Sequence, residues 1–538
     1  MKAKIHVNQL GYISGLSKKA SFTGQSSGFE IIDSKTRKTM YAGRLEKALF
    51  DESSGDTVST ADFSPFSREG RYYVRIGRRN SYEFEIKCRP YSEFRKAMIK
   101  AFYYNRCSAT DDSYAGEYAH NSCHTAPAVL FGNEKITVDT SGGWHDSGSY
   151  GKYVTTACTA LGRMLYSYKL FPGAFEEKGN IPFSSSDVPD ILTECRHELE
   201  WLLKMQARTG GVYHKVCTLD VTDFVLPQDD EGKQYVFGCS HHATALFVAV
   251  TALASGIYEK YDKDFADMLQ SAAFNGWIWL NNRPSYIPFV NPSEVKFATS
   301  GDMDAINFED ILFWTVCELY SMTGEDIFRE KILGLYKKVC VTGFSCTAAG
   351  GFGALAYTLC RRKTDMEVER SIRLQYRVEA DNLMALAEKS GYETAMAPDD
   401  YRIASNITVM TNAMVLITAY ILHQCQAYLG IAQEQLNYIL GKNPVGISYV
   451  TGFGTEYAKN PHHRMSAFDD VDEAVPGMVV IGPNSKSDDD FAKWNIPKGT
   501  PPAKCYCDNN FCYSTNETSV GCCSAALFVT AFFDTFEE

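Results

Sequence analysis

The hydrophobic pattern of the chain changes period near residue 90, and this change limits the fold more than any other feature. Before it, β-rich runs such as GRYYVRIG and YEFEIKC alternate with turns of Gly, Ser and Asp. After it, apolar residues recur at three- and four-residue intervals, as in VPDILTECRHELEWLLKMQ. The first pattern is typical of strands and the second of helices. We therefore predict a β-domain over residues 1–88 and a helical domain over residues 92–538.

The spacing of the strands predicts a small sandwich of the immunoglobulin type. The helical stretches that follow are too many for a four-helix bundle and show no fixed-period repeat. A closed double ring of helices fits them, with function carried on the long loops at one end. The first three stretches are EFRKAMIKAFYYNRC, KYVTTACTALGRMLYSYKLF and VPDILTECRHELEWLLKMQ. Similar stretches recur at 241–256, 263–281, 308–322, 326–339, 347–361, 376–389, 405–427, 430–440 and 519–535.

Charge and cysteine usage exclude several classes of protein. The formal net charge of −12 argues against a nucleic-acid-binding surface. No segment approaches 18 uninterrupted apolar residues, so no membrane span is expected. The opening MKAKIHVNQLGY lacks the apolar core of a signal peptide. The 17 cysteines are odd in number and scattered through helical patterns, unlike a disulfide scaffold. We therefore predict a cytoplasmic protein.

Four loops carry the residues suited to chemistry. SGGWHDSGSYGKYV presents Asp146 just ahead of a helix, and GGVYHKV presents Tyr213 after one. The long segment ending in NPHHRMS contains His462 and Arg464, and DNNFCYSTNE ends in Glu517 before the last helix. A single loop carboxylate is most often a helix cap or a solvated acid. Four such loops in one helical domain indicate a built site.

These motifs, in this order, resemble glycoside hydrolase family 9, which comprises inverting cellulases and cellodextrinases. IHVNQLGY resembles the opening of the members with an N-terminal immunoglobulin-like domain, and KNPVGISYVTGFG, PGMVVIGPNS and STNE also match. The resemblance runs nearly end to end. It implies a mainly α fold, an (α/α)6 barrel preceded by the small β-sandwich, and an enzyme that hydrolyses glycosidic bonds.

The resemblance also implies roles for individual residues. Glu517 matches the general acid, which must stay protonated near neutrality to donate to the leaving oxygen. Asp146 matches the first aspartate of the family's Asp-x-Gly-Asp loop, which helps to hold the attacking water. His462 and Arg464 match residues that line the sugar subsites. Tyr213 is expected either to line the cleft or to be purely structural.

Ser149 departs from the family pattern, because it occupies the position of the second aspartate, the usual catalytic base. A serine hydroxyl has no useful basicity near neutral pH, and an inverting hydrolase needs a carboxylate to deprotonate water. Three explanations stay open. Asp146 has taken over as base, Ser149 is an engineered substitution, or the enzyme uses a charged nucleophile such as phosphate that needs no base.

Two metal sites are predicted. Cys107, Cys123, His124 and His145 have the composition of a closed structural zinc site, and related family members carry zinc on the same arrangement. His145 precedes Asp146, so zinc would pin the catalytic loop. The acidic run 469–473 is a weaker prediction, either a calcium site or a solvated turn.

Together these features predict an intracellular enzyme that cleaves β-linked gluco-oligosaccharides, such as cellodextrins, with inversion. The alternatives are a phosphorolytic or amino-sugar-specific enzyme of the same fold, and a catalytically silent sugar-binding relative. The expected partner is an oligosaccharide, with neither nucleic acid nor membrane. The sequence leaves the oligomeric state open.

Overall fold

A computed structural model of the protein describes residues 4–110, 112–220, 224–283, 285–286, 288–295 and 306–536. By compactness the chain divides into two units. Unit 1 comprises Met1–Ala101 and Val378–Glu538, and unit 2 comprises Phe102–Arg377. Unit 1 therefore joins the β-rich N-terminal segment to the last part of the helical region.

The N-terminal segment of unit 1 forms two sheets. One has the strand order β1-β3-β7-β6, and the other β2-β10-β8-β4-β5, with β9 paired to β8. The strands are β1 (Ile5–His6), β2 (Gly11–Ile13), β3 (Lys19–Phe22), β4 (Gly28–Asp33), β5 (Thr39–Arg44), β6 (Leu49–Asp51), β7 (Asp56–Asp62), β8 (Gly70–Ile76), β9 (Arg79–Asn80) and β10 (Phe84–Lys87).

The core of this β-domain forms where the alternating apolar residues of its strands meet. Tyr12 lies edge-on to both Phe63 and Phe84, with ring centroids 5.2 and 5.1 Å apart. The first strand of the second sheet, β2, pairs in parallel with the last strand of the domain, β10. Strand β10 therefore lies between β2 and β8 in the sheet, directly before the segment that leads into the helices.

Helices are the main regular element of the remaining chain. They are α1 (Ser92–Tyr104), α2 (Asp112–Ala115), α3 (Val154–Leu170), α4 (Asp190–Lys204), α5 (His241–Tyr258), α6 (Lys263–Asn281), α7 (Phe308–Thr323), α8 (Asp326–Leu335), α9 (Gly350–Thr358), α10 (Met366–Ala387), α11 (Ser405–His423), α12 (Gln426–Ile439), α13 (Arg464–Phe468), α14 (Asp490–Asn495), α15 (Tyr513–Asn516) and α16 (Val520–Asp534).

Alternate helices of unit 2 form two layers. Helix α5 packs against both α3 and α7, and α7 packs in turn against α9. The intervening helices α4, α6 and α8 each pack against the preceding or following member of that inner row. The inner helix α5 is apolar and buried almost all round, whereas α4 is amphipathic, as an outer helix should be. This alternation is the arrangement that a double ring requires.

In unit 1, α11 packs against α12 and α16. Helices α5 and α11 are the two in the described ranges that are long and apolar enough to cross a membrane by length and composition. The most apolar 18-residue window of α5 is 89% buried inside the protein, and that of α11 is 61% buried. Both helices therefore belong to the protein core.

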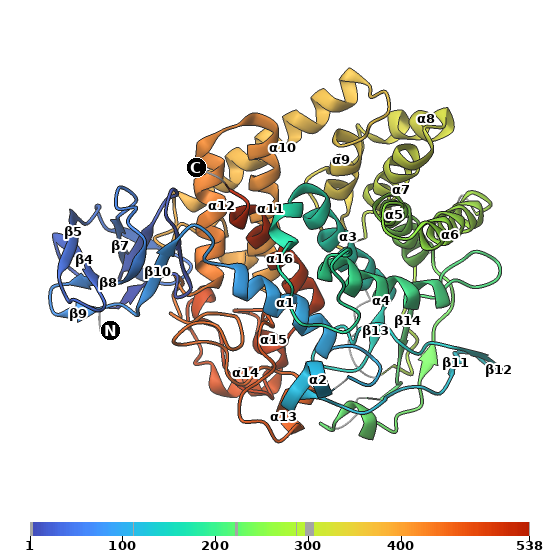
Figure 1. The fold of residues 1–538 in the computed structure, drawn as a ribbon, viewed down its shortest axis with the longest axis horizontal. Coiled ribbons are helices and arrows are strands. Elements are labelled where there is room, and N and C mark those ends of the chain that lie inside the picture. Colours follow the sequence, from blue (N-terminus) through green and yellow to red (C-terminus); the bar gives the residue numbers. More distant parts are fainter. Residues whose placement is uncertain are drawn as a thin grey trace. The chain divides into compact units, whose positions relative to one another are not determined.

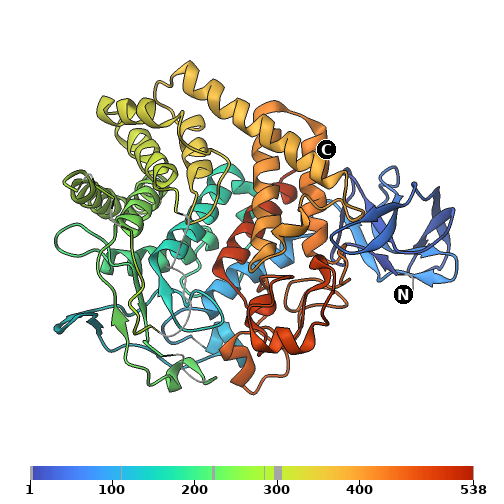
Figure 2. The same ribbon diagram turned by 180° about the vertical axis from the view of Figure 1, so that it is seen from behind.

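The loops of unit 2 contain a sheet that the sequence pattern does not predict. Its strand order is β12-β11-β15-β14-β13, and it lies at one end of the unit 2 helices in both views (Figures 1 and 2). The strands are β11 (Ala128–Leu130), β12 (Asn133–Val138), β13 (Lys152–Tyr153), β14 (Lys215–Cys217) and β15 (Tyr235–Val236). This sheet orders the segments that were expected to be irregular connections.

Candidate functional site

The predicted site residues fall on both units. Unit 2 carries the loop of Asp146 and Ser149, the four predicted metal ligands and Tyr213, and unit 1 carries Glu517, His462 and Arg464.

The loop 141–150 of unit 2 is held against α4. Gly142 and Gly143 have φ values of 86° and 76°, and a side chain on Gly143 would collide with the ring of Trp201. The Trp144 backbone N–H donates to Glu198 Oε2 at 2.6 Å, and its indole N–H donates to Glu194 Oε1 at 2.8 Å. Both carboxyls belong to α4, so a rigid helix fixes the start of the loop.

Asp146 is a fixed, buried carboxylate. Only 6% of the residue is exposed, and its backbone N–H donates to the carbonyl oxygen of Gly151 at 3.0 Å. The hydroxyl of Thr156, in the first turn of α3, donates to Asp146 Oδ1. Ser149 differs from Asp146, since it is half-buried and its hydroxyl makes no hydrogen bond to any residue that the structure describes.

Glu198 is a second carboxyl beside this loop that the sequence motifs did not single out. It is 1% exposed, and burial raises its pKa well above the usual range, with the Trp144 amide opposing that rise. Its Oε1 has no hydrogen-bond partner among the described residues. Glu198 therefore supports the loop by accepting the hydrogen bond from the Trp144 amide.

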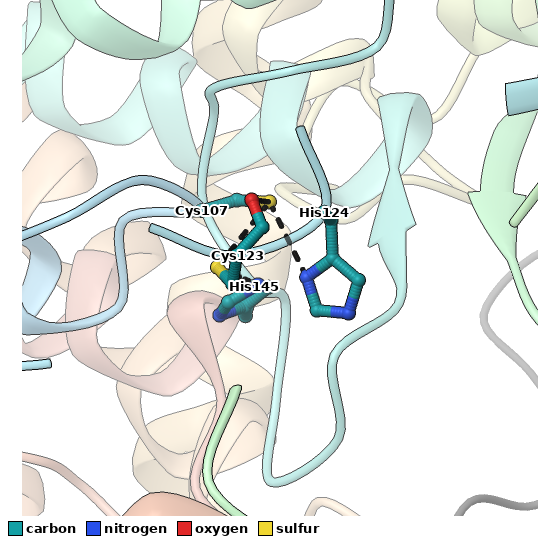
Figure 3. A group of neighbouring side chains, drawn as sticks. All are labelled: Cys107, Cys123, His124 and His145. Carbon is teal, nitrogen blue, oxygen red and sulfur yellow. Dashed lines mark hydrogen bonds between the residues drawn. The ribbon is translucent and has the colours of Figure 1, made fainter. Parts of the chain in front are cut away.

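Cys107, Cys123, His124 and His145 come together as predicted (Figure 3). One ligand atom from each lies within 4.8 Å of the others, the only such cluster in the described ranges. The two thiol sulfurs are 3.9 Å apart, Cys107 Sγ lies 3.7 Å from His124 Nδ1, and Cys123 Sγ lies 3.9 Å from His145 Nε2. Three segments of unit 2 thus converge on a candidate metal site.

Two further residues support this cluster. Asp230 Oδ2 lies 3.2 Å from His124 Nε2, so the carboxylate orients the imidazole whose other nitrogen faces the thiols. The buried Lys152 ammonium donates to Cys107 Sγ at 3.3 Å and to the carbonyl oxygen of Gly142 at 2.9 Å. Asp230 lies 106 positions from His124, and no local pattern in the sequence connects them.

The acidic run 469–473 gives no comparable site. It takes no part in any cluster of three or more metal-binding groups among the described residues. Asp469 Oδ1 accepts from the Val471 backbone N–H at 3.1 Å, and Tyr457 donates to Glu473 Oε2 at 2.6 Å. Calcium at this turn remains a prediction.

Tyr213 lies in unit 2 and is half-buried. It forms an isolated antiparallel bridge with Cys239, and its backbone N–H donates to the carbonyl oxygen of Met205 at 3.0 Å. Burial raises the pKa of its phenol, so the hydroxyl is neutral near pH 7.

In unit 1, backbone pairing places Glu517 beside the PHHR segment. His462 forms an isolated parallel bridge with Glu517, and its N–H donates to the carbonyl oxygen of Asn516 at 2.8 Å. The N–H of Ile481 donates to the carbonyl oxygen of Glu517 at 2.9 Å. The carboxyl side chain therefore projects from a short extended segment that is fixed on both sides.

The asparagine before the acid stiffens this turn. The Asn516 amide donates to the carbonyl oxygen of Asn460 at 2.6 Å and to Asp508 Oδ1 at 3.1 Å. Tyr506 donates to its side-chain oxygen. The short helix α15 thus ends in a network that fixes where Glu517 emerges.

His462 and Arg464 flank the N-cap of α13. His462 Nδ1 donates to the carbonyl oxygen of Asn510 at 2.6 Å, and burial lowers the pKa of this imidazole to about 4. The ring is therefore neutral at pH 7, with Nε2 as its acceptor nitrogen. His463 caps α13 through Ser466, and Arg464 is 6% exposed.

Comparison with known proteins gives a consistent result over the whole chain. Residues 91–531 match the family model for glycosyl hydrolase family 9, and residues 1–81 match that for the cellulase N-terminal Ig-like domain. A cellodextrinase from Butyrivibrio fibrisolvens is 34% identical over 96% of this chain and 97% of its own.

Solved structures agree with these sequence matches. A single mutant of the thermostable endoglucanase from Alicyclobacillus acidocaldarius superposes with a TM-score of 0.92 at 31% identity, over 99% of both chains. A Zn-binding triple mutant of a family 9 endoglucanase superposes with a TM-score of 0.90 at 29% identity, over 97% of this chain and 99% of the other. The predicted fold class, an (α/α)6 barrel after an immunoglobulin-like sandwich, is confirmed.

Proposed function

Because the chain belongs to glycosyl hydrolase family 9, and is therefore a glycoside hydrolase, we propose that it cleaves β-linked gluco-oligosaccharides of the cellodextrin type with inversion. The observation that carries this proposal is the backbone pairing of Glu517 with His462, which holds the segment of the proposed acid beside that of the proposed sugar-binding histidine. The end-to-end similarity to a cellodextrinase supports the choice of substrate.

In the proposed mechanism, Glu517 donates its proton to the glycosidic oxygen as the bond to the anomeric carbon breaks. Asp146 removes a proton from the water that attacks the opposite face of the sugar. Ser149 cannot do so, because its hydroxyl is not basic. Glu198 is not assigned this role, because one oxygen of its buried carboxyl already accepts from the Trp144 amide and burial raises the pKa of that carboxyl. Asp146, which accepts a hydrogen bond from Thr156, is the remaining carboxyl group on this loop and the proposed base.

We also propose that Cys107, Cys123, His124 and His145 hold a structural zinc ion. Ligand atoms about 2.0–2.3 Å from a tetrahedral Zn²⁺ lie about 3.3–3.8 Å from one another. The separations of 3.7–3.9 Å in this cluster are close to that geometry. When bound, the metal would supply folding energy and hold the segment that leads into Asp146, with no direct part in bond cleavage.

A reducing compartment is proposed as the place of action. All 17 cysteines are free thiols, and several, such as Cys195 and Cys317, lie in the helical core. Free thiols persist where glutathione keeps them reduced. Fractionation of the source cells with an antibody to the protein tests this, and recovery from the culture medium would contradict it.

The test of the proposed function is incubation with cellotetraose, followed by proton NMR of the first products, with and without phosphate. Inverting hydrolysis gives α-configured reducing ends at a rate that does not depend on phosphate. A sugar phosphate formed only when phosphate is present would show phosphorolysis instead. Binding of cellotetraose with no product, in this chain and in Ser149→Asp, would identify a silent sugar-binding relative.

A further inference from the structure

A group of exposed aromatic side chains lies on the segment that leads to Glu517. Trp494 is 82% exposed, Phe511 55% and Tyr513 40%, and the half-buried Phe491 contacts Phe511. These four residues are called the aromatic platform below. A cluster of exposed aromatic side chains often marks a binding surface.

The local fold explains why Trp494 faces outward. Ala492 of α14 and Ile496, directly after it, are buried in a small core with Cys505 and Cys512, and Phe491 packs partly against this core. Trp494, midway between the two buried positions on a helix, must then point away from that core. Phe491 lies three residues before Trp494, on a neighbouring part of the helix surface, and its ring centroid is 6.1 Å from that of Phe511.

Contacts through Tyr513 and His462 connect the aromatic platform to the segment that carries Glu517. Tyr513 donates to the carbonyl oxygen of Asp488 at 3.1 Å, which ties α15 to the residues before α14. The Tyr513 ring also lies across that of His462, with centroids 6.0 Å apart. His462 in turn pairs with Glu517 through the backbone. In Figure 1, α13, α14 and α15 lie together in unit 1.

The charges of this segment favour a neutral occupant. Asp489 accepts from the backbone N–H groups of Ala492 and Ser514, and Asp490 pairs with Lys493 at 2.9 Å. These two carboxylates therefore already have partners within the protein. The aromatic platform presents ring faces, which suit the C–H faces of uncharged glucose units. It gives no reason to prefer a cationic amino sugar.

We propose that the aromatic platform binds the outer glucose rings of longer cellodextrins, beyond the two rings at the scissile bond. This inference rests on the proposed function, because it takes the occupant to be the same oligosaccharide that Glu517 cleaves. The platform would then set the preference for chain length, with Trp494 and Phe511 as its main stacking surfaces.

Binding to a variant that does not turn over gives the test. Kd is measured by calorimetry for cellopentaose and cellobiose with Glu517→Gln, alone and combined with Trp494→Ala or Phe511→Ala. A lost aromatic contact should raise the Kd for cellopentaose about threefold to tenfold, and that for cellobiose less. Trp494→Tyr should restore most of the affinity. Phe50→Ala is the matched control, since Phe50 is a 62% exposed phenylalanine on β6.

Two results would overturn the inference: equal Kd values for cellopentaose with and without the platform rings, or the same loss for Phe50→Ala. A different result would show that the proposed function is wrong while the platform inference holds. In that case cellopentaose binding would still depend on the platform rings, but neither this chain nor Ser149→Asp would cleave cellotetraose. Circular dichroism of each variant checks that the fold is retained. Wild-type tryptophan fluorescence should also shift on addition of cellopentaose, and Trp494→Tyr should lose that shift.

Discussion

Ser149 shares its loop with a carboxylate, Asp146, that is buried and already accepts a hydrogen bond from Thr156. Its own hydroxyl is half-buried and makes no hydrogen bond within the described ranges. Ser149→Asp should therefore add a second carboxylate without breaking an existing contact. A general base contributes about 10²–10⁴-fold, so kcat for cellotetraose should rise by up to that factor.

Two variants on the same loop sharpen this prediction. Asp146→Asn should abolish the activity of the present chain if Asp146 is the base, and Ser149→Asp should restore part of it. Ser147→Asp places the same charge two positions earlier and serves as the control. An unchanged rate in Ser149→Asp, or an equal gain in Ser147→Asp, would mean that position 149 has no special access to the attacking water.

Glu517→Gln keeps the shape of the acid and removes its proton. The kcat for cellotetraose should fall about 10²–10⁴-fold, because the leaving sugar hydroxyl needs that proton. An aryl cellobioside with an acidic phenol as leaving group should lose much less, since its leaving group departs without protonation. Stopped assays with both substrates measure the difference. Equal losses on the two substrates would argue for a role of Glu517 other than proton donation.

Single residues also show where sequence reasoning stops. The cluster of Cys107, Cys123, His124 and His145 could be predicted because its residue types suit zinc and related family members carry zinc on the same arrangement. Asp230 and Lys152 could not, because they reach the cluster only once β13, β14 and β15 have paired. Glu198 was visible as one acid in an amphipathic helix, but its contact with the Trp144 amide depends on the tertiary fold.

At the scale of elements, the cluster should hold one zinc ion per chain that orders the loop before Asp146. Metal analysis of the purified protein should find stoichiometric zinc, and Cys123→Ser should lose it together with thermal stability. Asp230→Asn should keep the ligands but weaken zinc binding about 10–100-fold, measured by competition with a chelator. Asp229→Asn, at an exposed neighbouring position, should bind zinc like the wild type. Absence of stoichiometric zinc would contradict the assignment.

Helix boundaries were predictable where capping and periodicity agree. The stretch 263–281 coincides with α6, whose N-cap Asp262 accepts from the Phe265 backbone N–H. The stretch 405–427 was extended too far, since α11 ends at His423 and Gln424 adopts a φ of 55°. The sheet β11–β15 was not predicted because its strands are short and pair over long separations, as Val129 does with Tyr235.

At the scale of the molecule, the β-domain is joined to the helical part of unit 1 by a buried ionic network. Lys442 is fully buried and lies 2.7 Å from Glu434 and 2.8 Å from Glu393. Lys19 of β3 reaches Glu393 at 2.5 Å. The Asn8 amide donates to Asn437 Oδ1 of α12 at 2.8 Å. The β-domain therefore shares a polar core with the segment that leads to His462.

Lys442→Met should destabilise the protein strongly, because it leaves the buried Glu434 and the partly buried Glu393 without their central cation. Removing one partner of a buried pair costs about 3–5 kcal/mol, whereas an exposed pair contributes about 0–1 kcal/mol. Lys493→Met is the matched control, since Lys493 and Asp490 form an exposed pair on α14. Urea unfolding followed by circular dichroism compares the free energies of unfolding of the two variants with that of the wild type.

The pH dependence of this loss follows from Glu393. Burial opposes its ionisation, but the charges of Lys442 and Lys19 lower its pKa from 4.5 to about 2. A carboxyl whose pKa is lowered by folding stabilises the protein above its unfolded pKa and loses that contribution as pH falls through the folded value. The cost of Lys442→Met should therefore be largest above pH 4.5 and shrink as the pH falls towards about 2. A cost that is independent of pH over this window, or no larger than that of Lys493→Met, would mean that packing rather than charge holds the β-domain in place.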